Sequence, residues 1–331
     1  VIVGRVGASD AGIIVTNGSL NTTSGMNFGS QPSGTGLFQD TTVGFSASNS
    51  DISSGSFFNI GTYIDYTTGS GDYLSVLDLS KGNFNVTSDL LIGGSIIDEA
   101  SEANITGTHE ITMNAISSPG IGGNFIVGQY SNGSGVTISD DYDFEISDIS
   151  SFTINNDLSV LSSETTLDET TSADLLWNIM GSTLDVEGNF SVGILANNPD
   201  GQTFFDSDVM ITGSVIDVGN KLTLGESLNF YESGTNMVRT DVSANDSFMT
   251  AGQLDIGVMS LPLICVTESK VTLTDSFVEL DVSSPSISFD GVPLELGKDS
   301  ELVFVANGTT RASESNLTGT DLYSAIDVFE S

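Results

Sequence analysis

The sequence contains little of the chemistry from which disulfide scaffolds, metal sites and nucleophilic active sites are built. Cys265 is the single cysteine, so no disulfide can form within the chain. It lies in the apolar run LPLICV, which favours a buried structural thiol over a reactive one. His109 is the single histidine. Triads and zinc sites built on histidine need more than this residue can supply, so we expect His109 to be a surface residue of a strand.

Basic residues are scarce. Seven Lys and Arg oppose 44 Asp and Glu, giving a formal net charge of -37. Such a field repels nucleic acid and anionic membrane, and no apolar run approaches the roughly 20 residues of a membrane span. The charge either solubilises the surface or fits salty surroundings, where it is screened. We expect no nucleic-acid partner, no membrane insertion, and a location in a virion, outside the cell or on its surface.

Polar and apolar residues alternate along much of the chain. In residues 83–87, Phe84 and Val86 fall on one face and polar residues on the other, and residues 151–155 and 286–290 repeat the pattern. This period of two is typical of half-buried strands, and Gly, Asn, Asp and Ser clusters between them supply turns. The sequence therefore predicts an all-β protein of short stacked strands, arranged as a β-helix, as β-sandwich segments or as a trimeric fibre shaft.

One phrase recurs along the chain. It reads KGNFNVTSDLLIGGSI at residues 81–96, and relatives occur at residues 122–128, 187–193 and 218–225. We expect its apolar residues Phe84, Val86, Leu90 and Ile92 to be core contacts and its glycines to be corners. A second motif places Asp between two apolar residues, at positions 77–79, 184–186, 216–218, 254–256 and 280–282. The uneven spacing favours stacked strands with variable loops over a strict solenoid.

Composition divides the chain into regions. We expect a separate Gly- and Ser-rich β region at 1–70 and two β-repeat regions at 71–162 and 181–319. The acidic connector at 163–180 ends in Leu175, Leu176, Trp177 and Ile179 and could form a short helix. A terminal helix is expected at 320–331, with Thr320 as its N-cap.

Carboxylates are the only abundant reactive groups. Asp140, Asp141 and Asp143 form the densest cluster, together with Glu145. Paired carboxylates could hydrolyse a glycan, but calcium, which takes six to eight oxygens, is the better use of acidic loops. We therefore take Asp140, Asp141 and Asp143 as candidate calcium ligands, and consider a second set at Asn198, Asp200, Asp206 and Asp208. We expect no catalytic residue and no cofactor other than calcium.

Asn-x-Ser/Thr sequons are slightly more frequent than chance predicts. Nine occur in the sequence, where random placement would give roughly six. The sequons at Asn85 and Asn189 lie inside the repeated phrase, where alternation directs both side chains outward. Two more sequons begin at Asn104 and Asn307. The candidate glycosylation sites are Asn17, Asn21, Asn132, Asn245, Asn307 and Asn316.

The phrase GNFNVTSDLLIGGSI resembles the G-N-L-x-V-x-G-x-L-x-V-x-G strings of viral and phage fibre proteins, including tail fibres and collar whiskers. The resemblance covers about a third of the chain. It implies a homotrimeric shaft with strands from three chains around one axis, and a role in connecting virion parts or binding the host.

We therefore expect a non-enzymatic virion structural protein of the tail-fibre or spike type. Its partners would be copies of itself in a homotrimer or larger assembly, other virion proteins, and a host glycan or receptor. One alternative is an extracellular surface-layer, sheath or filament subunit of a salt-adapted microbe. The other is a secreted β-helical glycan hydrolase.

Overall fold

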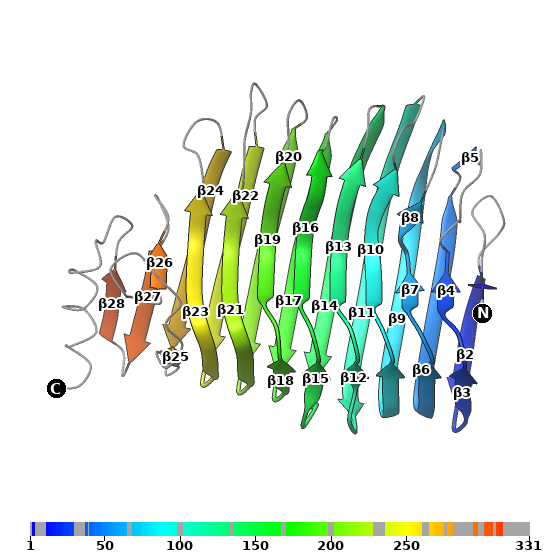
Figure 1. Cartoon of the computed structure of the whole chain (residues 1–331), viewed down its shortest axis with the longest axis horizontal. Helices are drawn as coiled ribbons and strands as arrows, with labels where there is room; N and C mark the ends of the chain where they lie inside the picture. Colours follow the sequence, from blue (N-terminus) through cyan, green and yellow to red (C-terminus); the bar gives the residue numbers. More distant parts are fainter. Residues whose placement is uncertain are drawn as a thin grey trace.

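The structure is a computed structural model in which every element of the described chain is a β-strand (Figure 1). The described residues are 2–3, 11–29, 37–38, 40–64, 68–97, 102–132, 135–166, 170–197, 202–227, 236–259, 265–274, 277–280, 294–296, 301–306 and 309–313. Within them, no helix is long and apolar enough to cross a membrane. The all-β prediction is confirmed.

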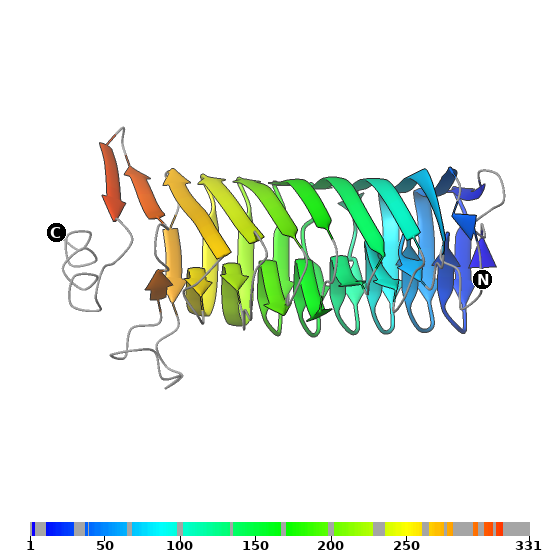
Figure 2. The same ribbon diagram turned by 90° about the horizontal axis from the view of Figure 1, so that it is seen from above.

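The strands stack side by side along one axis as a parallel β-solenoid (Figures 1 and 2), in which each circuit of the chain adds one layer to three ladders. The first ladder consists of β2 (Ala11–Thr16), β6 (Thr41–Ser54), β9 (Thr68–Val86), β11 (Glu102–Ile116), β14 (Val136–Ser147), β17 (Thr171–Met180), β20 (Thr203–Thr212), β22 (Asn236–Asn245), β24 (Cys265–Thr274) and β27 (Glu301–Ala306), with β5 (Leu37–Phe38) beside β9.

The second ladder consists of β1 (Ile2–Val3), β4 (Met26–Phe28), β7 (Phe58–Ile60), β8 (Tyr63–Ile64), β10 (Leu90–Ile97), β13 (Phe125–Asn132), β16 (Leu158–Thr166), β19 (Phe190–Asn197), the later parts of β21 (Val215–Ser227) and β23 (Phe248–Met259), and β26 (Leu294–Leu296).

The third ladder consists of β3 (Ser19–Thr22), the later parts of β6 and β9, β12 (Gly120–Ile121), β15 (Phe152–Ile154), β18 (Thr183–Val186), the first parts of β21 and β23, and β25 (Phe277–Leu280). Only the pair of β27 with β28 (Thr309–Ser313) is antiparallel among the described strands.

The repeat is regular, so the prediction of a loose repeat is wrong. Thr41 pairs with Tyr73, 32 residues later, and Leu90 pairs with Phe125, 35 residues later. The phrase misleads because its copies occupy different ladders. Phe84 of the first copy pairs with Ile52 in the third ladder, whereas Phe125 of the next copy stacks on Leu90 in the second. The shared unit is an Asp or Asn, then two apolar residues one position apart, then Gly in most layers.

Left-handed residues form the corners of each circuit. Between the first and third ladders, one residue per layer has a φ between 49° and 58°: Asn17, Asn49, Lys81, Ala115, Asp148, Gly181, Gly213 and Asp246. Asn, Asp and Gly adopt this conformation at the lowest cost, which explains their frequency here. A similar column bends the second ladder, and there Leu161, with a φ of 47°, occupies a position that is otherwise glycine.

The inside of the stack is a continuous apolar core. Phe84, Val86, Leu90 and Ile92 are all buried, which confirms the predicted core contacts. Trp177 stacks on Phe144 with ring centroids 4.9 Å apart and an interplanar angle of 7°. Full burial of each such side chain contributes about 1.5–3 kcal/mol, so the stack is held mainly by apolar contacts between adjacent layers.

Polar side chains close two of the corners from layer to layer. The Oγ of Ser214 accepts the backbone N–H of Ser182 at 3.1 Å and donates to the carbonyl of Thr212 at 2.9 Å. Ser247 binds the N–H of Ser214 in the same way at 3.2 Å. At another corner, the side chains of Asp89, Asn124 and Asp157 each accept the backbone N–H of the equivalent residue in the next layer. Corner N–H groups that lie between strands therefore stay paired.

Two regional predictions meet the structure directly. Residues 171–180 form β17, not a helix, because Leu175, Trp177 and Ile179 alternate inward with a period of two. The described strands also pair in register across residues 70 and 162, so the sheet continues through these expected boundaries. The predicted terminal helix at 320–331 lies outside the described residues, as does the side chain of Cys265.

Candidate functional site

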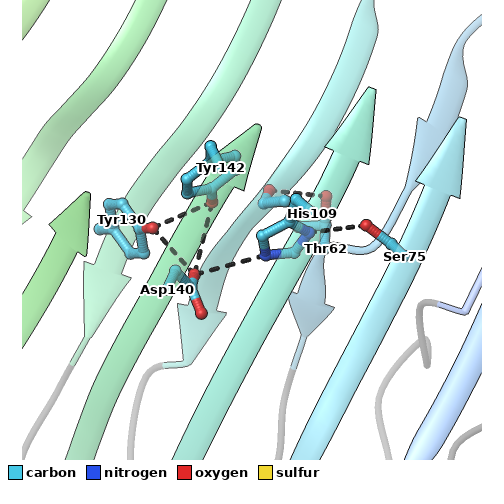
Figure 3. A network of polar contacts seen from close by, with 7 residues as sticks. Thr62, Ser75, His109, Tyr130, Asp140 and Tyr142 are labelled. Carbon is cyan, nitrogen blue, oxygen red and sulfur yellow. Dashed lines mark hydrogen bonds and ion pairs between the residues drawn. The ribbon is translucent and has the colours of Figure 1, made fainter. Parts of the chain in front are cut away.

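A network of polar side chains lies inside the stack (Figure 3). Ser75 of β9, His109 of β11 and Tyr142 of β14 are register partners on three successive strands of the first ladder. Asp140 precedes Tyr142 by two residues and faces the same side, and Tyr130 of β13 reaches the group from the second ladder. The regular stack thus brings five chemically active side chains to one point in the core.

The contacts within this group are short. Nδ1 of His109 lies 2.6 Å from Oγ of Ser75, and its Nε2 lies 3.7 Å from Oδ2 of Asp140. The same carboxylate oxygen accepts the hydroxyl of Tyr130 at 2.8 Å and that of Tyr142 at 3.4 Å, and the two hydroxyl oxygens are 2.9 Å apart. The imidazole stacks on Tyr142 with a centroid distance of 4.4 Å.

Burial controls the protonation of the two phenols. Desolvation, followed by the Asp140 carboxylate, raises the pKa of both Tyr130 and Tyr142 well above its ordinary value. Both hydroxyls therefore stay protonated at any physiological pH, and they remain available as donors to the carboxylate.

The group has the composition of a Ser-His-Asp triad, but nothing outside can reach it. Ser75 is 1% exposed, His109 0% and Asp140 1%. Nucleophilic catalysis requires the serine oxygen to meet a substrate carbonyl in an accessible site. A cavity of ≈ 10 Å³ in the described chain lies at the corner formed by Ser50, Lys81 and Gly82, and holds no more than about one water molecule. The geometry fits a structural polar core.

The prediction of a surface position for His109 is wrong. Ile105, Ile111 and Met113, which share its strand and its parity, are also buried. The alternation of the sequence contains this signal, since Ile111 follows His109 by two residues. The same reading would have separated Asp140 from its neighbours, because Tyr142 and Phe144 share its parity.

The predicted calcium ligands do not converge. Alternation along β14 buries Asp140 and leaves Asp141 and Asp143 exposed on the opposite side of the strand. Within the described part of the chain, no three His, Cys, Asp or Glu side chains gather closely enough to hold a metal ion. Of the second set, Asn198 and Asp200 lie outside the described residues, and Asp206 and Asp208 contact Arg239.

The outer face of the first ladder forms an acidic strip. Asp141, Asp174 and Asp206 are register partners on β14, β17 and β20, and Arg239 occupies the next layer. The guanidinium of Arg239 lies 3.2 Å from Asp206, 3.8 Å from Asp208 and 2.6 Å from Asp241. These carboxylates hold the pKa of Arg239 above its ordinary value.

Two carboxylates of the acidic strip have a raised pKa. For Asp174 the cause is partial burial, followed by the charges of Asp141 and Asp206. For Asp206 it is again partial burial, which outweighs the opposing effect of Arg239, and Asp208 adds to the rise. Neighbouring strands lie about 4.8 Å apart, so like charges in one column of the ladder are close enough to disfavour full ionisation.

The sequon residues lie in different surroundings. Asn17, Asn21 and Asn245 are exposed, and so are Asn85 and Asn104. Asn132 ends β13, and its side chain is outside the described ones, as are Asn307 and Asn316.

No protein-family model matches this chain, and neither does a curated protein or a solved structure. The fold and the two polar groups described above are therefore the basis on which a function is proposed.

Proposed function

We propose that this chain is a non-enzymatic structural protein, an elongated and rigid part of a virion or cell-surface assembly. The observation that carries the proposal is the single-chain stack. Each described layer pairs with the next layer of the same chain, over the whole series from β2 to β27 (Figure 1). Such a stack lengthens in one direction and suits a part that spans a distance or presents a repeated surface.

The distribution of polar groups supports the same proposal. The only Ser-His-Asp group in the described chain is sealed in the core, where it satisfies buried donors and acceptors. The outer face of the first ladder instead presents charged side chains at strand spacing. A partner that approaches this face meets a row of carboxylates, which favours cationic groups or bound counter-ions.

Shape, location and activity together test the proposal. Small-angle X-ray scattering of the purified chain should give a rod-like particle, and light scattering the number of chains in it. Immunogold electron microscopy should place the protein on virions or on the cell surface. A uniform cytoplasmic distribution, or turnover of any glycan in a broad polysaccharide panel, would refute the structural role.

Glycan hydrolysis is the second candidate, and one observation favours it. Asp174 and Asp206 lie on adjacent strands, and the pKa of each is raised. Retaining glycosidases use two carboxyl groups about 5–5.5 Å apart, one of which acts as an acid. If this role is correct, polysaccharide cleavage is lost in Asp174→Asn and Asp206→Asn but kept in Asp78→Asn, a carboxylate of the same outer face on β9. Equal activity in all three variants would exclude it.

A further inference from the structure

We infer that Asn21, Asn85 and Asn104 carry N-linked glycans, whereas Asn17, Asn189 and Asn245 do not. The inference starts from strand geometry, because residues i and i+2 of a strand point to the same side. A sequon within a strand therefore places its Asn and its Ser or Thr together on the outer surface, with the middle residue in the core.

The sequons at Asn85 and Asn104 have this arrangement. Asn85 and Thr87 are exposed and Val86 is buried between them. Asn104 and Thr106 are likewise exposed on either side of buried Ile105. A sugar on either amide would point into solvent and leave the core residue undisturbed.

The neighbouring layers leave room for a substituted amide. Strands lie about 4.8 Å apart, so a glycan stem requires small side chains in the layers above and below. Asn85 has Ser53 and Gly120 as its register partners. A Cβ at Gly120 would lie 3.2 Å from Oδ1 of Asn85, so glycine keeps this amide uncrowded.

The other two acceptors have equally small neighbours. Asn104 has Ser70 and Thr137 as register partners. Asn21 pairs with Ser53 and so lies in the same column as Asn85, two layers away, or about 9.6 Å. Among the described residues, no hydrogen bond uses the side-chain amides of these three asparagines.

The remaining described sequons are engaged in the fold. The amide of Asn189 donates to Asp157 at 3.1 Å, and Oδ1 of Asn17 accepts the amide of Asn49 at 2.6 Å. The sequon of Asn245 depends on Ser247, whose buried Oγ accepts the N–H of Ser214 and donates to the carbonyl of Asn245. Glycosylation at these three positions would break contacts between layers.

Glycopeptide mass spectrometry on the folded full chain, secreted from a eukaryotic cell line, tests the inference. We expect glycans at Asn21, Asn85 and Asn104 and unmodified peptides for Asn17, Asn189 and Asn245. Thr87→Ala and Thr106→Ala should each abolish one glycan, while Trp177 fluorescence shows that the variants fold. Unmodified Asn85 and Asn104, or a glycan on Asn189 in the folded fraction, would overturn it.

Discussion

Replacing Asp140 with alanine should lower the free energy of unfolding by about 3–5 kcal/mol, the usual cost of breaking a buried charged pair by removing one partner. The carboxylate is buried, accepts the Tyr130 hydroxyl at 2.8 Å and pairs with His109 at 3.7 Å. Tyr130 and Tyr142 keep their mutual contact at 2.9 Å, so most of the loss falls on the imidazole.

The double variant His109→Leu/Asp140→Leu separates the pair from its surroundings. Replacing both partners by apolar groups removes the uncompensated polarity, so the double variant should be more stable than the sum of the single changes predicts. The expected coupling is about 0.5–3 kcal/mol, as for other residues in one network. Residual cost remains, because Ser75 and the two tyrosines then lose partners.

Urea unfolding followed by the fluorescence of Trp177 measures these differences. Trp177 is the only tryptophan, is buried, and lies on the strand next to that of Asp140. Asp141→Ala is the matched control, because its exposed side chain should change stability by less than about 0.5 kcal/mol. The reasoning fails if Asp140→Ala falls within about 1 kcal/mol of the parent or if the single changes simply add.

Three further changes test the corners and the acidic strip. Gly213→Ala should cost about 1–2 kcal/mol from backbone strain alone, since its φ is +58° and a Cβ there meets nothing within 4 Å; Gly94→Ala should cost more, because its Cβ would lie 2.2 Å from a backbone oxygen, and equal midpoints in thermal unfolding would contradict this. Ser214→Ala should cost about 1–3 kcal/mol by leaving a corner N–H unpaired, against less than about 0.5 kcal/mol for exposed Ser243→Ala, as measured by urea unfolding. Asp174→Asn should raise stability at pH 7 and flatten its pH dependence, because burial and two neighbouring aspartates raise the pKa of Asp174 in the folded state. The folded protein then binds this proton more tightly than the unfolded chain, so the contribution of Asp174 to stability falls as pH rises above the ordinary aspartate pKa of about 3.9; urea midpoints at pH 5 and pH 7 that change equally in parent and variant would refute it.

The fold class and the orientation of most strands could be predicted from the sequence. Alternation places Phe84 and Val86 inward, and both are buried. It also contains the information for residues 171–180, where Leu175, Trp177 and Ile179 have the period of a strand. The helix prediction fails there because adjacent apolar residues, Leu175 and Leu176, suggest a helical face, although Leu176 is exposed.

Register between layers could not be predicted from the repeated phrase. Similar letters recur on different ladders because every ladder requires the same pattern of an apolar residue, an outward residue and a second apolar residue. What distinguishes the ladders is the position of the left-handed corner, and Asn49, Lys81 and Ala115 fill equivalent corners with different side chains. Pairing of residues 184–186 with 216–218 is the exception, since both carry an Asp between apolar residues and they stack directly.

The buried network was hidden by the residue types themselves. His109 and Asp140 are polar, and a general preference of polar residues for the surface outweighed the parity of their strands. The partners come from different layers, more than 30 residues apart in the sequence, and Tyr130 comes from another ladder. Only the three-dimensional stack brings them together.

The one-dimensional arrangement of layers has a consequence for how such a protein can change in evolution. Each layer contacts chiefly the layer before and the layer after it, and the offset of 32 residues between Thr41 and Tyr73 defines one complete unit. Duplication or deletion of one such unit would alter the length of the stack by about 4.8 Å and leave contacts elsewhere unchanged. Reach is thus a property that can be tuned in small genetic steps, independently of the chemistry displayed on each face.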